Sequence, residues 1–335
     1  MHRIAFLLVP GVHLLDLAGP AQVFSTAARD GLPYRLTYIA DHPAGDGSGG
    51  DGSGGDGSGG ELCDVATAQG VALRAPAAWP DLTPDDVVVV PGWRWAAGAA
   101  DAPHAPPVSP GAARRLAAHH AAGGLVASVC SGAFALAHAG LLDGRRCTTH
   151  HELQDALTRR HPRATVVRDV LYVTDGRVVT SAGIASGIDL ALHLLAARHG
   201  PGAAARVART MVVYARRNGD EPQAGVMFRH RGHLSDAVHR AQDIIDATYT
   251  RPLPLADLAA AAGVSERTLT RRFTAATGLT PLRYQQELRL ERAGHLIGQG
   301  ATADAAARAV GFTDARMLRR LRARAGGAAA GAPPV

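Results

Sequence analysis

The sequence predicts two folded parts: an α/β domain with a mostly parallel sheet, followed by an all-helical domain. The chain has 335 residues, more than twice the ~150 residues of a typical domain. Strand-like apolar runs alternate with helical patterns up to about residue 209, whereas only helical patterns follow residue 234. Apolar residues make up 47% of the chain, enough to build a core in each part.

Five runs of the first part have the composition of strands. Each is short and largely apolar, which is typical of strands in a parallel sheet covered on both faces. The runs are 4–9, Tyr34–Ala40, Val87–Val90, Leu125–Val129 and Val178–Ser181. Segments with helical character lie between or after them, at 14–28, 111–122, 131–139 and 186–197. This alternation predicts a flavodoxin-like sandwich with helices on both sides of the sheet.

Composition marks an insertion and the domain boundaries. Residues 46–60 read DGSGG three times, which predicts a flexible surface loop. Calcium binding is the alternative, but a period of five matches no known calcium loop. A polar stretch around Pro222 without periodicity predicts a linker. We therefore expect a ligand-sensing domain at 1–212, a linker at 213–233, a helical domain at 234–326 and a disordered tail at 327–335.

Charge is unevenly distributed between the two parts. Residues 229–335 contain 16 Arg and 9 acidic residues, a net +7, whereas residues 1–228 carry a net −1. A basic domain beside a neutral one favours nucleic-acid binding, although a solvated basic face would look the same. Three cysteines, no apparent secretory signal and no apolar run of ~18–20 residues predict a cytoplasmic protein without a membrane partner.

Residues 255–273 predict a helix-turn-helix. Gly263 permits the tight turn, Ser265 is a good N-cap, and Leu269 and Phe273 point inward four residues apart. The N-cap and the outward residues of the second helix are the candidate DNA contacts: Ser265, Glu266, Arg267, Thr268, Thr270, Arg271 and Arg272. An arginine there can donate two hydrogen bonds to a guanine edge or pair with phosphates.

The same pattern recurs near the C-terminus. A short helix at 303–309 and a turn at 310–312 precede Thr313, which we expect to cap a helix. Its candidate DNA contacts are Thr313, Arg316, Arg319 and Arg320. A connecting helix at 281–297 separates the two units, so they could enter successive turns of the major groove.

This segment resembles the AraC/XylS family of transcription regulators. The resemblance rests on S-x-R-x-L-x-R-x-F at 265–273, R-L-E-R-A at 289–293 and V-G-F at 310–312. It implies sequence-specific DNA binding, usually by an activator that contacts RNA polymerase. Leu318 and Leu321 stand where the family usually has aromatic residues, so we expect the second unit to be less stable or a weaker reader of bases.

A cysteine ends the fourth predicted strand of the first part. Cys130 is followed by Ser131 and Gly132, the small neighbours that a sharp strand-to-helix turn needs. We expect the helix N-terminus to favour the thiolate. His150 and Asp16 could complete a nucleophile, base and acid arrangement. Alternatively, Cys130 is a packing residue in a ligand pocket, Asp16 only caps a helix, and His150 caps or packs.

This part resembles the PfpI-like, class I glutamine amidotransferase-like superfamily, in the version fused to AraC-type domains (GlxA-like regulators). The motifs are D-L-A-G-P at 16–20, V-C-S-G-A-F at 129–134, T-T-H at 148–150 and T-S-A-G-I-A-S-G-I-D-L-A at 180–191. The superfamily includes proteases, hydratases and chaperone-like proteins, whereas the fused regulators imply sensing of a small, possibly nitrogen-containing molecule.

The resulting hypothesis is a transcription regulator that forms a homodimer and is controlled by a small-molecule effector. The candidate ligand residues are Asp16, Gly92, Cys130, Ser131, His150 and Ser186. We expect neither a cofactor nor a metal. One alternative is a cysteine-dependent hydratase or hydrolase that uses Cys130, His150 and Asp16. Another is a redox sensor that forms a sulfenate at Cys130.

Overall fold

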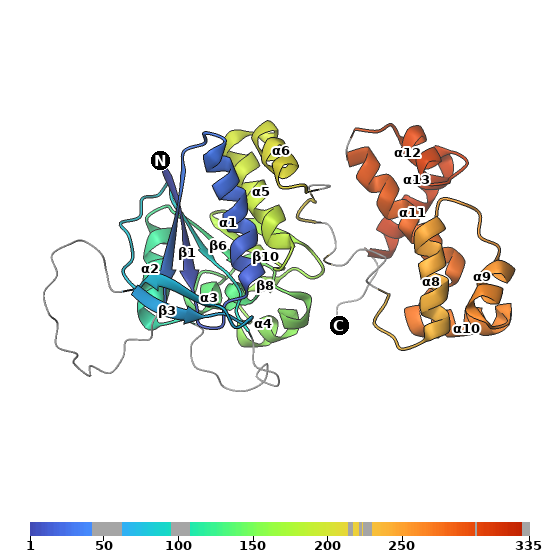
Figure 1. Cartoon of the computed structure of the whole chain (residues 1–335), viewed down its shortest axis with the longest axis horizontal. Coiled ribbons are helices and arrows are strands. Elements are labelled where there is room, and N and C mark those ends of the chain that lie inside the picture. The colour runs from blue at the N-terminus through green and yellow to red at the C-terminus, as the bar shows by residue number, and fades with distance from the viewer. Residues whose placement is uncertain are drawn as a thin grey trace, which may run out of the picture. The chain divides into compact units, whose positions relative to one another are not determined.

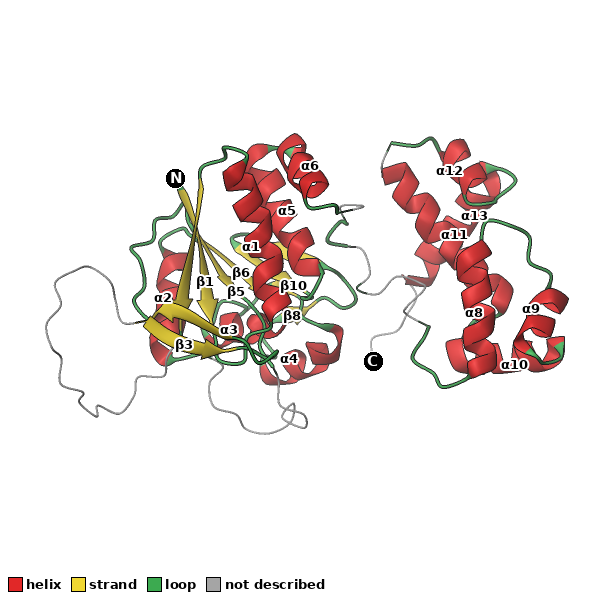
Figure 2. Cartoon of the chain, viewed as in Figure 1, coloured by secondary structure: helices red, strands yellow, loops and turns green. Residues whose placement is uncertain are grey.

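The computed structural model describes residues 1–41, 62–94, 108–213, 217–220, 223, 230–298 and 300–329, with only the backbone described at 324–329. The predicted 46–60 loop lies outside these residues. The chain forms two compact units, Met1–Gln223 and Ala224–Val335. Strands occur in the first unit, and the described part of the second is helical (Figure 2).

A six-stranded sheet organises the first unit. Its strands are β1 (His2–Leu8), β2 (Tyr34–Ala40), β5 (Val87–Val90), β6 (Leu125–Val129), β9 (Tyr172–Asp175) and β10 (Val178–Ser181). Their order is β2-β1-β5-β6-β10-β9, and every neighbouring pair is parallel except β10 with β9. The predicted mostly parallel sheet is therefore confirmed.

The alternation of side chains along the strands explains the two layers of helices. In β1, Ile4 and Phe6 join one apolar core, whereas Ala5 and Leu7 join the other, and all four are fully buried. A strand with both faces buried is expected to be apolar at every position, and β1 is apolar from Ile4 to Leu8. The sheet consequently separates two cores.

Helices cover both faces. They are α1 (Leu14–Arg29), α2 (Pro110–Ala121), α3 (Ala133–His138), α4 (Gln154–Arg160), α5 (Ser186–His199) and α6 (Pro201–Thr210). The helices α1, α5 and α6 gather on one side of the sheet (Figure 1). The core on the other side contains residues of α2, α3 and α4. The carboxyl ends of the parallel strands meet at one edge, where α1, α3 and α5 begin.

Several smaller elements were not predicted. They are the hairpin β3 (Leu62–Ala66) and β4 (Ala72–Pro76), the parallel pair β7 (Arg146–Cys147) and β8 (Thr165–Val166), strand β9, and helices α4 and α6. Most are short and partly exposed, so their sequences lack a strong apolar period. Strand β9 adds an antiparallel strand at one edge of the predicted sheet, and the other strands form two separate two-stranded sheets.

The second unit packs around two cores joined by one helix. Its helices are α8 (Asp236–Thr248), α9 (Leu255–Ala262), α10 (Glu266–Thr277), α11 (Pro281–Gly298), α12 (Ala303–Ala309) and α13 (Ala315–Ala329). One core includes Leu269, Phe273 and Tyr284, and the other includes Leu318 and Leu321. Helix α11 contributes to both, as the predicted connecting helix requires. Helix α13 extends three residues into the predicted tail, and residues 330–335 lie outside the described residues.

Candidate functional site

Cys130 forms a strained elbow at the carboxyl end of β6. Its φ of 56° is unusual for a residue with a side chain. Two glycines make room for it. A Cβ on Gly183 would lie 2.2 Å from the Cys130 Cβ, and one on Gly92 would lie 2.7 Å from the same atom. The residue is 7% exposed, so the thiol sits in a closely packed pocket of backbone.

Asp16 is the acidic neighbour of the thiol. It lies in the first turn of α1, is fully buried, and accepts a hydrogen bond from the Ile184 backbone N–H to Oδ1 at 2.5 Å. Among the described residues, Oδ2 has no donor of good geometry, although it faces Gly92 and the Cys130 side chain. Asp16 therefore does not merely cap a helix, because its carboxylate joins α1 to the turn before α5.

The same turn carries further strain. Ile184 has a φ of 51°, which is a clear outlier for a β-branched residue. Ser186 is buried and donates from Oγ to the Gly183 carbonyl at 2.9 Å. The Ser186 hydroxyl thus holds the turn in shape, and the strained Ile184 N–H is aimed at Asp16.

Burial disfavours the charged forms of both Cys130 and Asp16. Burial raises the pKa of Cys130 far above its usual range, and the nearby charges of Asp16 and Glu152 raise it further. Burial also raises the pKa of Asp16, against the opposing hydrogen bond from Ile184. The expectation of a thiolate was therefore wrong. The Ser131 N–H at the start of the helix favours the thiolate, but desolvation outweighs it.

Ser131 and Gly92 form the opposite wall of the elbow. The Ser131 hydroxyl accepts a hydrogen bond from the Trp93 N–H at 2.8 Å and donates one to the Trp93 carbonyl at 3.1 Å. These bonds fix the segment around Gly92. A Cβ on Gly92 would lie 2.4 Å from Asp16 Oδ2, so this backbone approaches the carboxyl as closely as glycine allows.

His150 lies at the rim of the site. Its side chain is 25% exposed, its Nδ1 lies 3.7 Å from Glu152 Oε2, and its ring centroid lies 4.3 Å from that of His151 with the ring planes tilted by 36°. Burial lowers its pKa, with a further contribution from His151. The preceding Thr149 donates from Oγ1 to the Cys130 carbonyl at 2.8 Å. The contacts of the described residues pair the thiol with Asp16 rather than with His150.

The sequence analysis missed Thr149, Ile184 and Glu152 as parts of this site. Thr149 and Ile184 fall within motifs that the sequence displayed, at 148–150 and 180–191, but their contacts depend on tertiary structure. Glu152 immediately follows the first of these motifs. The described residues contain no group of three or more potential metal ligands.

The first helix-turn-helix comprises α9 and α10. Gly263 adopts a left-handed conformation with a φ of 70°, and Ser265 accepts a hydrogen bond from the Thr268 N–H at 3.3 Å. Leu269 and Phe273 are fully buried. The exposed residues of α10 include Glu266, Arg267, Arg271 and Arg272. This helix consequently presents three arginines to solvent on a rigid, capped scaffold.

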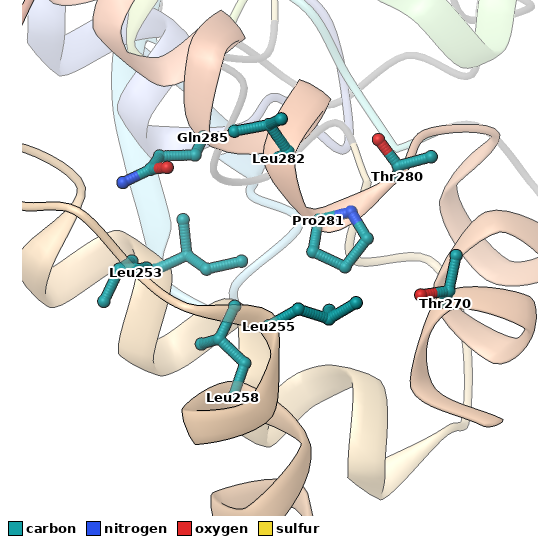
Figure 3. Close-up of a pocket in the computed structure, with 9 residues that line it drawn as sticks. Leu253, Leu255, Leu258, Thr270, Thr280, Pro281, Leu282 and Gln285 are labelled. Atoms are coloured by element: carbon teal, nitrogen blue, oxygen red, sulfur yellow. The ribbon is translucent and has the colours of Figure 1, made fainter. Parts of the chain in front are cut away.

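Thr270, another candidate DNA contact on α10, is less exposed than the three arginines. It is half-buried and lines an apolar hollow of about 300 Å³ in the second unit (Figure 3). The other lining residues are Ile245, Leu253, Leu255, Leu258, Thr280, Pro281, Leu282 and Gln285. Thr270 thus lies beside this hollow.

The second helix-turn-helix comprises α12 and α13, with Gly311 in the turn at a φ of 85°. Its cap differs from the prediction. Asp314 accepts the Met317 N–H at 2.9 Å, whereas Thr313 is exposed. Arg316, Arg319 and Arg320 are exposed on α13.

Arg289 of α11 links the turn of the second helix-turn-helix to the segment that follows α8. Its guanidinium donates to the carbonyls of Tyr249, Arg251 and Gly311 at 2.6–2.9 Å and lies over the Phe312 ring. Leu318 and Leu321 are buried in the second core. The leucines that replace the expected aromatic residues therefore fill this core.

A cysteine-elbow α/β unit followed by two helix-turn-helix units defines the class of protein. Residues 2–197 match the model of the DJ-1/PfpI family, and residues 258–331 match that of a helix-turn-helix domain. The chain belongs to the DJ-1/PfpI family and carries an AraC-type helix-turn-helix domain, as the two resemblances predicted. In the part of the chain that the structure describes, no helix has the length and hydropathy of a membrane span.

Two relatives are transcriptional regulators of Pseudomonas aeruginosa. The HTH-type transcriptional regulator GbdR is 32% identical over 51% of this chain and 47% of its own. The HTH-type transcriptional regulator ArgR is 31% identical over 89% of this chain and 82% of its own. The alignment with GbdR thus spans about half the length of that relative, whereas the alignment with ArgR spans both parts of this chain.

An enzyme and a solved structure are also similar to part of this chain. The isonitrile hydratase of Pseudomonas putida is 32% identical over 57% of this chain and 70% of its own. The crystal structure of a ThiJ/PfpI family protein from Pseudomonas syringae has a TM-score of 0.50 and 21% identity, and covers 78% of this chain and 90% of its own. The latter similarity supports the fold alone.

Proposed function

We propose that the protein is a sequence-specific DNA-binding transcription regulator whose first unit binds a small-molecule effector at the Cys130 elbow. The observation that carries this proposal is the pair of capped helix-turn-helix units with exposed arginines on α10 and α13. Exposed arginines on a second helix of this motif suit the major groove, where phosphate contacts position the helix and base contacts select the sequence. The similarity to ArgR across both units supports the same function.

The chemistry of the elbow favours a nitrogen-containing effector. Asp16 Oδ2 is a buried acceptor without a donor of good geometry among the described residues. A ligand N–H or ammonium placed there would supply that donor, and its charge would offset the desolvation of the carboxylate. The thiol of Cys130 would then pack against the ligand as a neutral group.

DNA binding is tested by selecting fragments of the source genome on the full-length protein. The fragment most enriched should bind at least ten times more tightly than random competitor DNA, with an affinity that falls steeply with salt. Equal affinity for random DNA at every salt concentration would reject sequence-specific regulation.

Arg271→Ala identifies the reading surface. It should weaken binding to the selected fragment by about 1–3 kcal/mol if Arg271 contacts a base. Arg206→Ala removes the same charge from an exposed position of α6 in the other unit and is the matched control. Equal losses for the two variants would reject α10 as the recognition helix, whereas a loss that is equal on all sequences would assign Arg271 to a phosphate.

A second candidate function rests on the pairing of Cys130 with Asp16 and on the similarity to isonitrile hydratase. In this alternative Asp16 takes the thiol proton as Cys130 attacks the substrate, because His150 has no described contact with the thiol. Cyclohexyl isocyanide is a suitable probe. Its consumption by the wild type and not by Cys130→Ser would favour hydratase activity, and no consumption by either would reject it.

Three further parts of the proposal come from the AraC-type resemblance. We infer a homodimer, contact with RNA polymerase as an activator, and a cytoplasmic location. The polymerase contact follows from the usual action of such regulators. Light scattering of the purified chain tests the dimer, and transcription in vitro from the selected fragment tests activation.

A further inference from the structure

The chain that leaves the first unit is bound back onto it. Residues 217–220 and Gln223, which we call the docked segment, follow the last helix of the first unit and precede the second unit. They form no helix or strand, yet they are held by hydrogen bonds and an ion pair to partners that include the buried residues Asp189 and Thr149. An ordinary surface connection needs no such partners.

The first attachment is an ion pair with α5. Arg217 donates to the Asp189 carboxylate from its backbone N, from Nε at 3.1 Å and from a terminal nitrogen at 2.5 Å. The Asp189 side chain is only 4% exposed. Asp189 lies in the first turn of α5, one turn after Ser186 and the strained backbone that donates to Asp16. The docked segment therefore neutralises a buried charge at the helix that begins at the elbow.

The second attachment involves Gly219 and β9. The Gly219 carbonyl accepts hydrogen bonds from the N–H groups of Leu171, at 2.8 Å, and Tyr172, at 3.3 Å. A Cβ at Gly219 would lie 2.7 Å from the Tyr172 carbonyl oxygen, so only glycine fits this approach. The exchange of these two amide protons consequently reports on whether the segment is docked.

The third attachment leads to the elbow itself. Gln223 donates from Nε2 to the carbonyls of Thr149, at 3.0 Å, and Val170, at 3.1 Å, and from its backbone N to Asp169 Oδ1 at 3.0 Å. Thr149 in turn donates from Oγ1 to the Cys130 carbonyl. A single residue thus separates the docked segment from the strained cysteine.

The Gln223 side chain is only partly satisfied in its hydrogen bonds. Its Oε1 is buried and has no hydrogen-bond partner among the described residues. A buried acceptor without a donor opposes docking, while the two donated bonds favour it. A small displacement of Thr149 can therefore change the balance between docked and released states.

We propose that the docked segment transmits changes at the Cys130 site to the chain that follows it. A change at the elbow reaches it through Thr149 and through the first turn of α5, and alters how firmly it is held. This restrains or frees the chain that leads to the second unit. The effect on DNA rests on the proposed function, whereas the coupling between elbow and segment does not.

Hydrogen exchange of the full-length protein tests the coupling. Gly92→Ala places a methyl group against Asp16 and Cys130 and imitates an occupant, and Cys130→Ala is a second perturbation that removes atoms instead. At least one should change the exchange of Leu171, Tyr172 and the docked segment by about threefold or more. Unchanged exchange in both folded variants would overturn the proposal.

Gln223→Leu breaks the route from the elbow to the segment that runs through Thr149. It removes both side-chain donors and should speed exchange at Leu171 and Tyr172 about tenfold. The same substitution at the exposed Gln22 of α1 is the matched control and should leave these amides unchanged. Equal exchange in Gln223→Leu and wild type would overturn the assignment of Gln223.

DNA affinity then tests the output. On the fragment selected from the genome, Gly92→Ala should change the Kd by about threefold or more in the wild type and by a clearly smaller factor in Gln223→Leu, where only the route through α5 remains. Equal fold-changes in both backgrounds, or none in either, would overturn the output to DNA. Failure of every variant to bind selectively would instead reject the proposed function, and the exchange data would still decide the coupling.

Discussion

The Cys130 elbow and the α10 helix place polar groups in opposite environments. At the elbow, Asp16 is fully buried and the thiol is nearly so, and burial raises the pKa of both. On α10, Arg267, Arg271 and Arg272 are exposed while apolar residues on the other side hold the helix. The elbow is thus a packed site where burial disfavours charge, whereas α10 offers a charged surface.

Because of this difference, we expect substitutions at the elbow to change stability, and substitutions of the exposed arginines on α10 to change binding. At the elbow, glycines and a buried carboxyl occupy fixed space, so a substitution disturbs the fold as well as the chemistry. On α10, replacing an exposed arginine removes few internal contacts, so the fold should be unaffected within about 0.5 kcal/mol. Substitutions in the two environments should therefore differ in their effect on the free energy of unfolding.

The largest effect is expected for Gly183→Ala. Its new Cβ would lie 2.2 Å from the Cys130 Cβ, and its φ of 93° is unfavourable for alanine. We expect the free energy of unfolding of the first unit to fall by more than about 3 kcal/mol, because steric overlap adds to backbone strain. Thermal and urea unfolding measure the loss.

Gly140→Ala is the matched control for this prediction. Gly140 has a φ of 74°, and a Cβ there would meet no atom within 4 Å. It should cost only about 1–2 kcal/mol, the strain of the left-handed conformation alone. Similar losses for the two variants would show that the close packing of the elbow contributes little.

Much of the fold could be predicted because its strands are apolar on both faces. The strands predicted at Val87–Val90 and Leu125–Val129 have the same bounds as β5 and β6. The hairpin β3–β4 escaped because each strand is five residues long and buries a single side chain, Val65 or Ala75. Short edge elements gain their stability from tertiary contacts, which a local pattern does not reveal.

The site was predicted in its residues but only partly in their roles. Cys130, Asp16 and Gly92 come together because each follows a strand that ends at the same edge of the sheet. The hydroxyls of Ser131 and Ser186 are used by the backbone of Trp93 and Gly183. The protonation of Cys130 depends on burial, which the helix position alone could not indicate.

Asp16→Asn should have a smaller effect on stability, and one of the opposite sign. Burial raises the pKa of Asp16 in the folded protein above the ~3.9 of an unfolded chain. Folding of the wild type therefore becomes less favourable as the pH rises from about 4 through the folded-state pKa, because the buried carboxyl must lose its proton. Asparagine keeps an oxygen for the Ile184 N–H without this penalty.

We expect Asp16→Asn to be more stable than the wild type at pH 8 by about 1 kcal/mol or more, with the difference shrinking towards pH 4. Urea unfolding across this pH range measures it. A difference that does not vary with pH would mean that Asp16 is not penalised by burial.

The smallest effect concerns the caps of the two helix-turn-helix units. Ser265→Ala removes the oxygen that accepts the Thr268 N–H and should cost about 1 kcal/mol. In the second unit the equivalent role falls to Asp314, not to Thr313. Asp314→Ala should therefore lower the melting temperature of the second unit, and Thr313→Ala should leave it unchanged.

The pH dependence of the second unit distinguishes these two caps further. The Met317 N–H lowers the pKa of Asp314, so its contribution is complete above about pH 4 and is lost as the pH falls through the folded-state pKa. Thr313 does not titrate. If Asp314 is the cap, the melting temperatures of wild type and Asp314→Ala should converge in acid, whereas those of wild type and Thr313→Ala should coincide at every pH. A loss of stability in Thr313→Ala that persists in acid would assign the cap to the hydroxyl instead.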